Sequence, residues 1–184
     1  MPLSVVLPLV LLVLVVFVLV VFVRRAAAAL ARAREAVAFA RETDALSRRM
    51  GSVVDPLLGR LDAVRRHQVP AVEVRAELAA AHGEFVAARE AIERWRTPRG
   101  FVPAREAIAA DLERLARSLE MIDFGTDLAG NGDGRQRELE AQTAIKRGYL
   151  NLLHARQAFA DHAAAVPGLT AAAVKGSRAS RIQW

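Results

Sequence analysis

The chain of 184 residues contains no cysteine, and only 5% of its side chains are aromatic. Without cysteine there can be no disulfide, no thiolate ligand for zinc or an iron–sulfur cluster, and no thiol nucleophile. Lysine is scarce too, because Lys146 and Lys175 are the only lysines among 26 basic side chains. The length suits one domain, or one small domain with an appendage.

The sequence also lacks the patterns that carry catalysis. Ser47, Ser52 and Ser118 lie in helical or capping surroundings, not in the strand–turn–helix context of an activated serine. The run GNGDG has neither the lysine nor the preceding strand of a phosphate-binding loop. The carboxylates alternate with arginines at helix-face spacing, which is typical of solvated ion pairs. We therefore expect no enzymatic activity and no cofactor.

Metal binding has little support in the sequence. No histidine has another histidine one helical turn away, so the usual helical metal-binding pair is missing. The four histidines are His67, His82, His154 and His162. We expect most of them at the surface and no metal site.

Residues 127–138 have a spacing close to that of a calcium-binding loop. Counting from Asp127 puts Asn131 at position 5 and Glu138 at position 12 of an EF-hand, but Ala129 at position 3 offers no side-chain oxygen. Counting from Ala129 instead loses the first carboxylate. We interpret the segment as a linker between helices, with a calcium loop as the alternative.

The N-terminus carries a long apolar run. From Val5 to Val23 there are 19 residues without a polar side chain, enough for a helix about 28 Å long, close to the hydrocarbon thickness of a bilayer. A cleaved signal peptide is the alternative, but the start MPLS has no basic residue and the run exceeds the usual 7–15 residues. We predict that residues 1–23 form a transmembrane anchor.

Basic residues follow the apolar run on one side only. Arg24, Arg25, Arg32 and Arg34 come directly after it, whereas the short N-terminal side has no lysine or arginine. The positive-inside rule then predicts an external N-terminus and a cytoplasmic C-terminal part at the cell membrane. We expect these four arginines to lie at the membrane surface and to contact anionic lipid headgroups.

Helical periodicity dominates the rest of the chain. Three segments carry apolar residues at alternating spacings of four and three, which puts one apolar stripe along each helix. The stripes are Val74, Leu78, Ala81, Phe85, Ala88, Ile92 and Trp95; Ile108, Leu112, Leu115, Leu119 and Ile122; and Ile145, Tyr149, Leu152, Arg156, Phe159, Ala163 and Val166. The short connections at 97–102 and 125–134 favour antiparallel packing. The fold class is therefore all-α, a transmembrane helix followed by an antiparallel helical bundle or coiled coil.

Boundaries within this layout follow from glycine, proline and charge. We predict a basic juxtamembrane helix over 24–50, interrupted at Gly51, and a bundle over 51–168 whose first helix starts at Asp55-Pro56. Residues 169–184 are predicted to be a disordered basic tail.

The net charge of +6 is unevenly distributed. Residues 24–50 carry seven arginines against three acidic residues, residues 51–168 carry 16 basic and 17 acidic residues, and the tail carries three basic residues. A nucleic-acid-binding domain would carry its positive charge on the folded body. The distribution instead favours an anionic lipid surface, and we expect no nucleic-acid partner.

One segment is unusual enough to be a candidate docking surface for a protein partner. It combines the only tyrosine, a mid-helix glycine and clustered basic groups: Lys146, Arg147, Gly148, Tyr149 and Arg156. Glycine inside a helix costs about 1 kcal/mol relative to alanine, so close approach of another backbone is expected at Gly148. The approaching element is either a neighbouring helix of the bundle or a partner.

The layout resembles that of LemA-type bacterial membrane proteins, which also place a helical bundle after an N-terminal anchor. The residues that carry the similarity are Glu138, Leu139, Glu140, Thr143, Arg147, Tyr149 and Phe159, within about 30 residues of the chain. The pattern of that family's first helices, a tryptophan and a Tyr-Asp-Leu-Ile-Pro-Asn-like run, is not found here.

The sequence therefore predicts a single-pass, membrane-anchored helical protein that acts as a non-enzymatic scaffold or adaptor. An apolar stripe cannot be buried by one isolated helix, so its helix faces must pack together or on an unknown protein partner. The alternative is a self-assembling, membrane-associated coiled coil with a structural or lipid-surface role.

Overall fold

The computed structural model describes the backbone of residues 3–130 and 135–179, and the side chains of residues 11–130 and 135–171. Within these ranges the protein is all-α, with no strand. The elements follow the order α1 (Leu3–Arg65), η1 (Ala71–Val74), α2 (Arg75–Glu93), η2 (Arg99–Phe101), α3 (Val102–Gly130) and α4 (Arg135–Ala179), where η marks a short 3-10 helix. The predicted fold class is confirmed.

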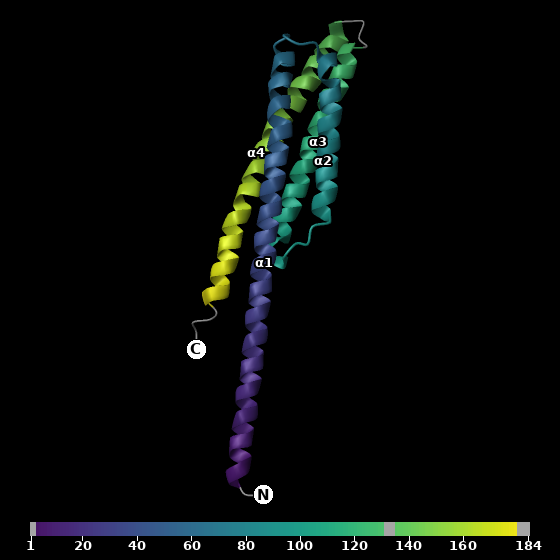
Figure 1. Cartoon of the computed structure of the whole chain (residues 1–184). Coiled ribbons are helices and arrows are strands. Elements are labelled where there is room, and N and C mark those ends of the chain that lie inside the picture. The colour runs from purple at the N-terminus through teal and green to yellow at the C-terminus, as the bar shows by residue number, and fades with distance from the viewer. Residues whose placement is uncertain (1–2, 131–134, 180–184) are drawn as a thin grey trace.

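The four helices form an antiparallel bundle around the C-terminal half of α1. Helix α1 runs the length of the molecule, and its N-terminal half projects beyond the other helices (Figure 1). The α3–α4 interface is the most extensive, and α4 also packs along α1 while α2 packs on α3. Short connections between successive helices give this up-and-down arrangement directly.

Helix α1 continues through the point where we expected a boundary. Gly51 and Pro56 both lie inside the 63-residue helix, so the prediction that a new helix starts at Asp55-Pro56 is wrong. A proline within a helix removes one backbone hydrogen bond. The apolar stripe nevertheless continues across it, because Val54 and Leu57 on either side are both buried. Burial of the flanking turns holds the helix together at the proline.

The bundle core also begins earlier than residue 51. Ala36 and Phe39 are each 1% exposed, so the segment that we predicted as a basic juxtamembrane helix outside the bundle contributes its last four turns to the core. The buried residues of α1 recur at spacings of three and four, which is the pattern of a helix packed on its neighbours. They are Ala36, Phe39, Thr43, Leu46, Met50, Val54, Leu57, Leu61 and Val64.

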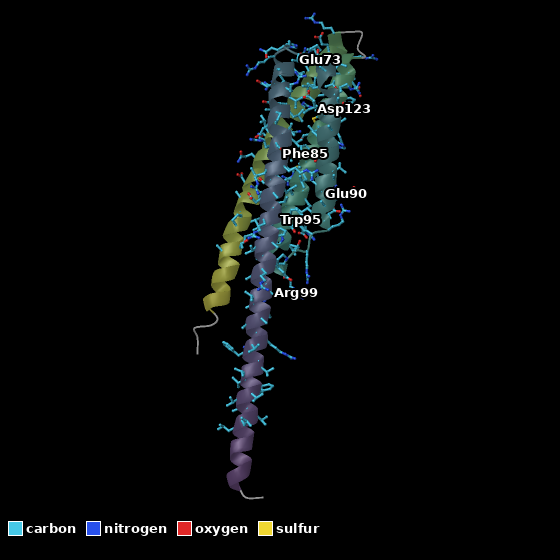
Figure 2. All side chains as sticks on the ribbon, viewed as in Figure 1. Glu73, Phe85, Glu90, Trp95, Arg99 and Asp123 are labelled. Carbon is cyan, nitrogen blue, oxygen red and sulfur yellow. The ribbon has the colours of Figure 1, made fainter. Side chains whose placement is uncertain are left out.

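The three apolar stripes predicted from the sequence face this core. Every predicted stripe residue of α2 and α3 is buried except Trp95, which is half-buried. In α4 the exceptions are Tyr149, half-buried, and Arg156, exposed. An aromatic cluster closes the lower end of the bundle, where Trp95 is labelled in Figure 2. There the ring of Phe39 lies 5.9 Å from Trp95 and 5.4 Å from Phe101, centroid to centroid.

Two other predicted boundaries are wrong. Helix α3 extends to Gly130 and includes Gly125, which we expected to begin a loop. Helix α4 passes through Pro167 and reaches Ala179, within the tail that we predicted to be disordered. Val166, directly before the proline, is fully buried, and the alanine-rich sequence after it has high helix propensity. The remaining tail residues, 180–184, lie outside the described residues.

Helix α1 ends in a defined backbone motif at His67. The N–H of Gln68 donates to the carbonyl of Ala63 at 2.9 Å, and the N–H of His67 donates to the carbonyl of Val64 at 3.0 Å. These two bonds form a Schellman motif, which requires a left-handed residue between helix and loop. His67 occupies that position with φ of 57°, where glycine is the usual residue.

Candidate functional site

Residues 11–23 of α1 are apolar on all sides of the helix, and almost all of them are exposed. Leu11 to Val20 are all exposed, with Phe17 65% exposed. The helix from Leu11 onward has a mean hydropathy of 2.6 in its most apolar window, and none of that window is buried. A surface helix of a soluble protein has apolar residues on one face only. This helix is long and apolar enough to span a membrane.

The predicted membrane-surface arginines follow this apolar segment. Arg24, Arg25, Arg32 and Arg34 are all exposed on α1, before the first buried residue of the core. Arg32 donates from Nε to the carbonyl of Ala28 at 3.2 Å, so its side chain folds back along the helix. The structure therefore presents these positive charges together on the narrow neck between the apolar segment and the bundle.

The residues of the predicted docking segment on α4 point in several directions. Tyr149 lies under the guanidinium of Arg65, 4.5 Å from Cζ to the ring centroid, and so packs against α1. Arg156 Nε donates to Asp55 Oδ1 of α1 at 2.9 Å. Lys146 and Arg147 are exposed. They line two different grooves, Lys146 the one near the end of α1 and Arg147 one beside α3. The five residues do not form one surface.

Gly148 faces α3, and Gly125 of α3 faces α4 in the same way. A Cβ atom built on Gly148 would lie 2.5 Å from Ile122 Cγ1 and 3.0 Å from the carbonyl oxygen of Ser118. A Cβ atom on Gly125 would lie 2.7 Å from Ile145 Cγ1. The backbone that approaches Gly148 is thus a neighbouring helix of the bundle. The paired glycines let the backbones of α3 and α4 approach each other closely.

A buried carboxylate lies further down the same interface. Asp111 of α3 is fully buried, and its Oδ2 lies 2.6 Å from Nδ1 of His162 on α4. Its Oδ1 lies 2.9 Å from Nη1 of Arg114 without the alignment of a hydrogen bond. Sequence reasoning missed this pair. The available signal was that Asp111 follows Ile108 by three residues and precedes Leu115 by four, which places it on the apolar stripe.

Two open grooves run along the outer side of the α3–α4 interface. The upper one, of about 690 Å³, has a floor of apolar residues, of which Met121, Phe124 and Leu139 are exposed and Leu128 is half-buried. The lower one, of about 510 Å³, is bordered by Arg114, Arg117 and His154. Met121 lines both grooves, and Asn151 Nδ2 lies 3.9 Å from its sulfur. We call the two together the α3–α4 groove.

Sequence analysis also missed the exposed apolar residues of this groove. Phe124 and Leu139 are each 59% exposed. Neither falls on the predicted stripe of its helix, since Phe124 lies two residues after Ile122 and Leu139 six residues before Ile145. Large apolar side chains off the buried stripe were the signal that could have identified a second apolar surface.

The opposite side of α3 is acidic and already paired with α2. Arg117 on α3 bonds to Glu113, and this hydrogen bond, the charge of Arg117 and the charge of Arg89 on α2 lower the pKa of the Glu113 carboxyl. His82 Nε2 of α2 lies 3.1 Å from Glu120 Oε1. The position 1 residue of the calcium-loop alternative, Asp127, lies inside α3 and pairs with Arg75. Residues 131–134 of that loop lie outside the described residues.

Comparison of the chain with models of protein families, with curated proteins and with solved structures finds no match. The functional interpretation therefore depends on the geometry of the apolar segment, the basic neck and the bundle surface.

Proposed function

We propose that the protein is a single-pass membrane protein whose helical bundle is a non-enzymatic scaffold or adaptor. The observation that carries this proposal is the continuity of α1. One unbroken helix contains the exposed apolar segment and, from Ala36 to Val64, a stripe of the bundle core. Because no hinge separates the two parts, the membrane segment fixes the height and direction of the bundle relative to the bilayer.

The basic neck supports a cytoplasmic position for the bundle. Positive residues flanking a span favour the cytoplasmic side, and residues 1–4 on the other side of the run contain no lysine or arginine. Arg24, Arg25, Arg32 and Arg34 lie within about 15 Å along the helix axis at 1.5 Å per residue. In this proposal they contact anionic headgroups and contribute about 1 kcal/mol each near the surface.

Topology can be tested with single-cysteine variants, because the natural chain has no cysteine to remove. Ser4→Cys precedes the apolar run, and Ser52→Cys is exposed on the bundle. A membrane-impermeant maleimide should label Ser4→Cys in intact cells and Ser52→Cys only after permeabilisation. The reverse labelling pattern would contradict the proposed orientation, and labelling of both in intact cells would contradict membrane insertion.

The adaptor role requires a partner protein that contacts the bundle. In-cell crosslinking of the full-length, C-terminally tagged protein, followed by purification in mild detergent and mass spectrometry, should recover a second protein in stoichiometric amount. Recovery of self-crosslinks alone would contradict the adaptor proposal. It would favour the self-assembling, membrane-associated structural role instead.

A further inference from the structure

The charges of α3 are divided between its two sides. On the side that faces α2, the acidic side chains lie against arginines or an imidazole of that helix. The pairs are Arg75 with Asp123 and Asp127, His82 with Glu120, and Arg89 with Glu113. Two basic residues of α3 line the α3–α4 groove, and each pairs within its own helix, Arg114 with Asp111 and Arg117 with Glu113. Their carboxylate partners do not line the groove.

Arginines outnumber carboxylates among the residues that line the α3–α4 groove. Arg114 and Arg117 border its lower part, and Arg147 of α4 borders its upper part. Glu140 is the one carboxylate among the described residues that line it. The guanidinium groups are accessible, since the side chains of Arg114 and Arg117 are 57% and 68% exposed.

The floor of the groove is apolar and has the length of a short helix. From Arg114 to Leu128 the lining residues cover 14 steps of α3, about 21 Å or four helical turns. Phe124 and Leu139 are exposed on either side of its upper part. An amphipathic helix laid in such a groove buries its own apolar stripe while its flanks meet the rim.

A second copy of the chain is a poor occupant if the protein spans a membrane in one orientation. Two copies related by an axis along the membrane normal have parallel grooves, with like ends at the same height. Arg114 and Arg117 would then face the same two residues of the other copy, and like charges brought together across an interface oppose association. An antiparallel pair would avoid this contact, but it needs two bundles pointing in opposite directions.

We propose that the α3–α4 groove binds an amphipathic helix of a partner protein, with an apolar stripe on the groove floor and acidic flanks on Arg114, Arg117 and Arg147. This inference rests on the proposed membrane-anchored adaptor role and identifies the partner chemistry that the bundle accepts.

The first test uses a defined probe and the full-length protein in neutral phosphatidylcholine nanodiscs. The probe is a fluorescent 18-residue helical peptide with a leucine stripe flanked by glutamates, and its matched control carries lysines in place of the glutamates. The acidic peptide should bind at least tenfold more tightly by fluorescence anisotropy, and the ratio should fall with added salt. Equal affinity for the two peptides would overturn the proposal.

Variants locate the binding on the groove. Phe124→Ser should weaken binding of the acidic peptide at least tenfold, whereas Val86→Ser, at an exposed apolar residue of α2, should leave it unchanged. Arg117→Gln should lower the ratio between the affinities of the acidic peptide and the lysine control peptide. Its control is Arg48→Gln, because Arg48 pairs with Asp44 at the same i,i+4 spacing as Arg117 with Glu113. Equal effects of a variant and its control would overturn the assignment.

Photocrosslinking in cells tests separately whether the α3–α4 groove is the binding site and whether the protein is an adaptor. A photoreactive phenylalanine analogue is placed in the full-length protein at Phe124 or at Val86. A crosslink from position 124 that maps to an acidic amphipathic helix of another protein supports the proposal. A crosslink from 124 to a second copy, or partner crosslinks from 86 alone, would overturn the groove but not the membrane location. Absence of any partner crosslink from either position would count against the adaptor role itself.

Discussion

The two halves of α1 have the same backbone conformation and opposite side-chain patterns. Leu11 to Val20 are exposed without exception, and the residues are almost entirely valine and leucine. From Ala36 to Val64 the buried residues recur every three or four positions, and polar residues fill the positions between them. The first half therefore matches a uniform apolar medium, and the second half matches particular neighbouring helices.

The two halves of α1 should differ in how much a single substitution costs. Lipid tails surround a span evenly, so one apolar side chain can replace another there at little cost. A close-packed core instead penalises the loss of a single methylene or the gain of a single methyl group. Substitutions of the same kind in the two halves should therefore have different effects. The largest effect is expected when charged residues replace apolar ones.

Charges in the apolar half should remove the protein from the membrane. Replacing Leu12, Leu14 and Val16 together by arginine introduces three charges near the centre of the span, at about 2.5–3.5 kcal/mol each on insertion scales. That total is comparable with the whole favourable insertion energy of the 18 valine, leucine and phenylalanine residues from Val5 to Val23, at about 0.3–0.6 kcal/mol each. The fraction of protein resistant to carbonate extraction should fall from nearly all to a minority.

The matched control puts three arginines on the exposed side of the second half of the same helix. Ala38→Arg, Ala45→Arg and Ser52→Arg together lie at exposed positions and should leave the membrane fraction unchanged. Equal loss in both triple variants would mean that the apolar half is not what holds the protein in the membrane.

Truncation of a leucine should instead cost stability in the bundle half of α1 and have no effect in the apolar half. Leu61 is fully buried, so Leu61→Ala removes packing and leaves a cavity, at about 2–5 kcal/mol. At about 2–4 °C per kcal/mol, the thermal midpoint measured by circular dichroism in detergent should fall by about 4–20 °C. Leu14→Ala, at a residue 60% exposed, should leave that midpoint unchanged. A similar drop for both variants would contradict the assignment of Leu61 alone to the core.

Glycine to alanine substitutions test the close packing within the bundle. Gly148→Ala places a methyl group 2.5 Å from Ile122 Cγ1, and overpacking of this kind costs about 1–3 kcal/mol. Gly83→Ala, in the exposed part of α2 with nothing within 4 Å of the new methyl group, should instead stabilise the protein by about 0.5–1 kcal/mol through higher helix propensity. The two denaturation midpoints should therefore move in opposite directions. A stabilised Gly148→Ala protein would mean that α3 and α4 can separate without loss.

The periodic part of this architecture could be predicted from the sequence, and the boundaries could not. Residues such as Leu78, Phe85 and Leu112 lie on regular stripes, and the stripe alone places them in the core. Gly51, Pro56 and Pro167 are residues that usually end helices, yet each lies inside one. Tertiary packing of the turns on both sides outweighed the local preference, and no local pattern contains that information.

The surface of the bundle was harder still to predict. Lys146 and Arg147 are adjacent in sequence but line different grooves, because successive residues of a helix point about 100° apart. Conversely, Phe124 and Leu139 come from different helices and meet at one groove. The register between α3 and α4, set by Gly125 and Gly148, decides which side chains share a surface. That register depends on three-dimensional packing.

The smallest expected effect is at the end of α1, where the backbone must adopt a left-handed conformation. His67 holds a φ of 57°, a conformation that costs a non-glycine residue about 1–2 kcal/mol. His67→Gly should therefore stabilise the bundle by about 1 kcal/mol and raise the thermal midpoint by about 2–4 °C.

His67→Ala removes the imidazole but keeps a Cβ atom, so it separates the backbone effect from the loss of the side chain. The alanine variant should not gain the stability of the glycine variant. If the two variants are equally stable, the imidazole and not the left-handed backbone limits stability at this helix end. The stability of the bundle half of α1 would then depend on side-chain packing up to its last residue. The other half would still depend only on the apolar character of its side chains.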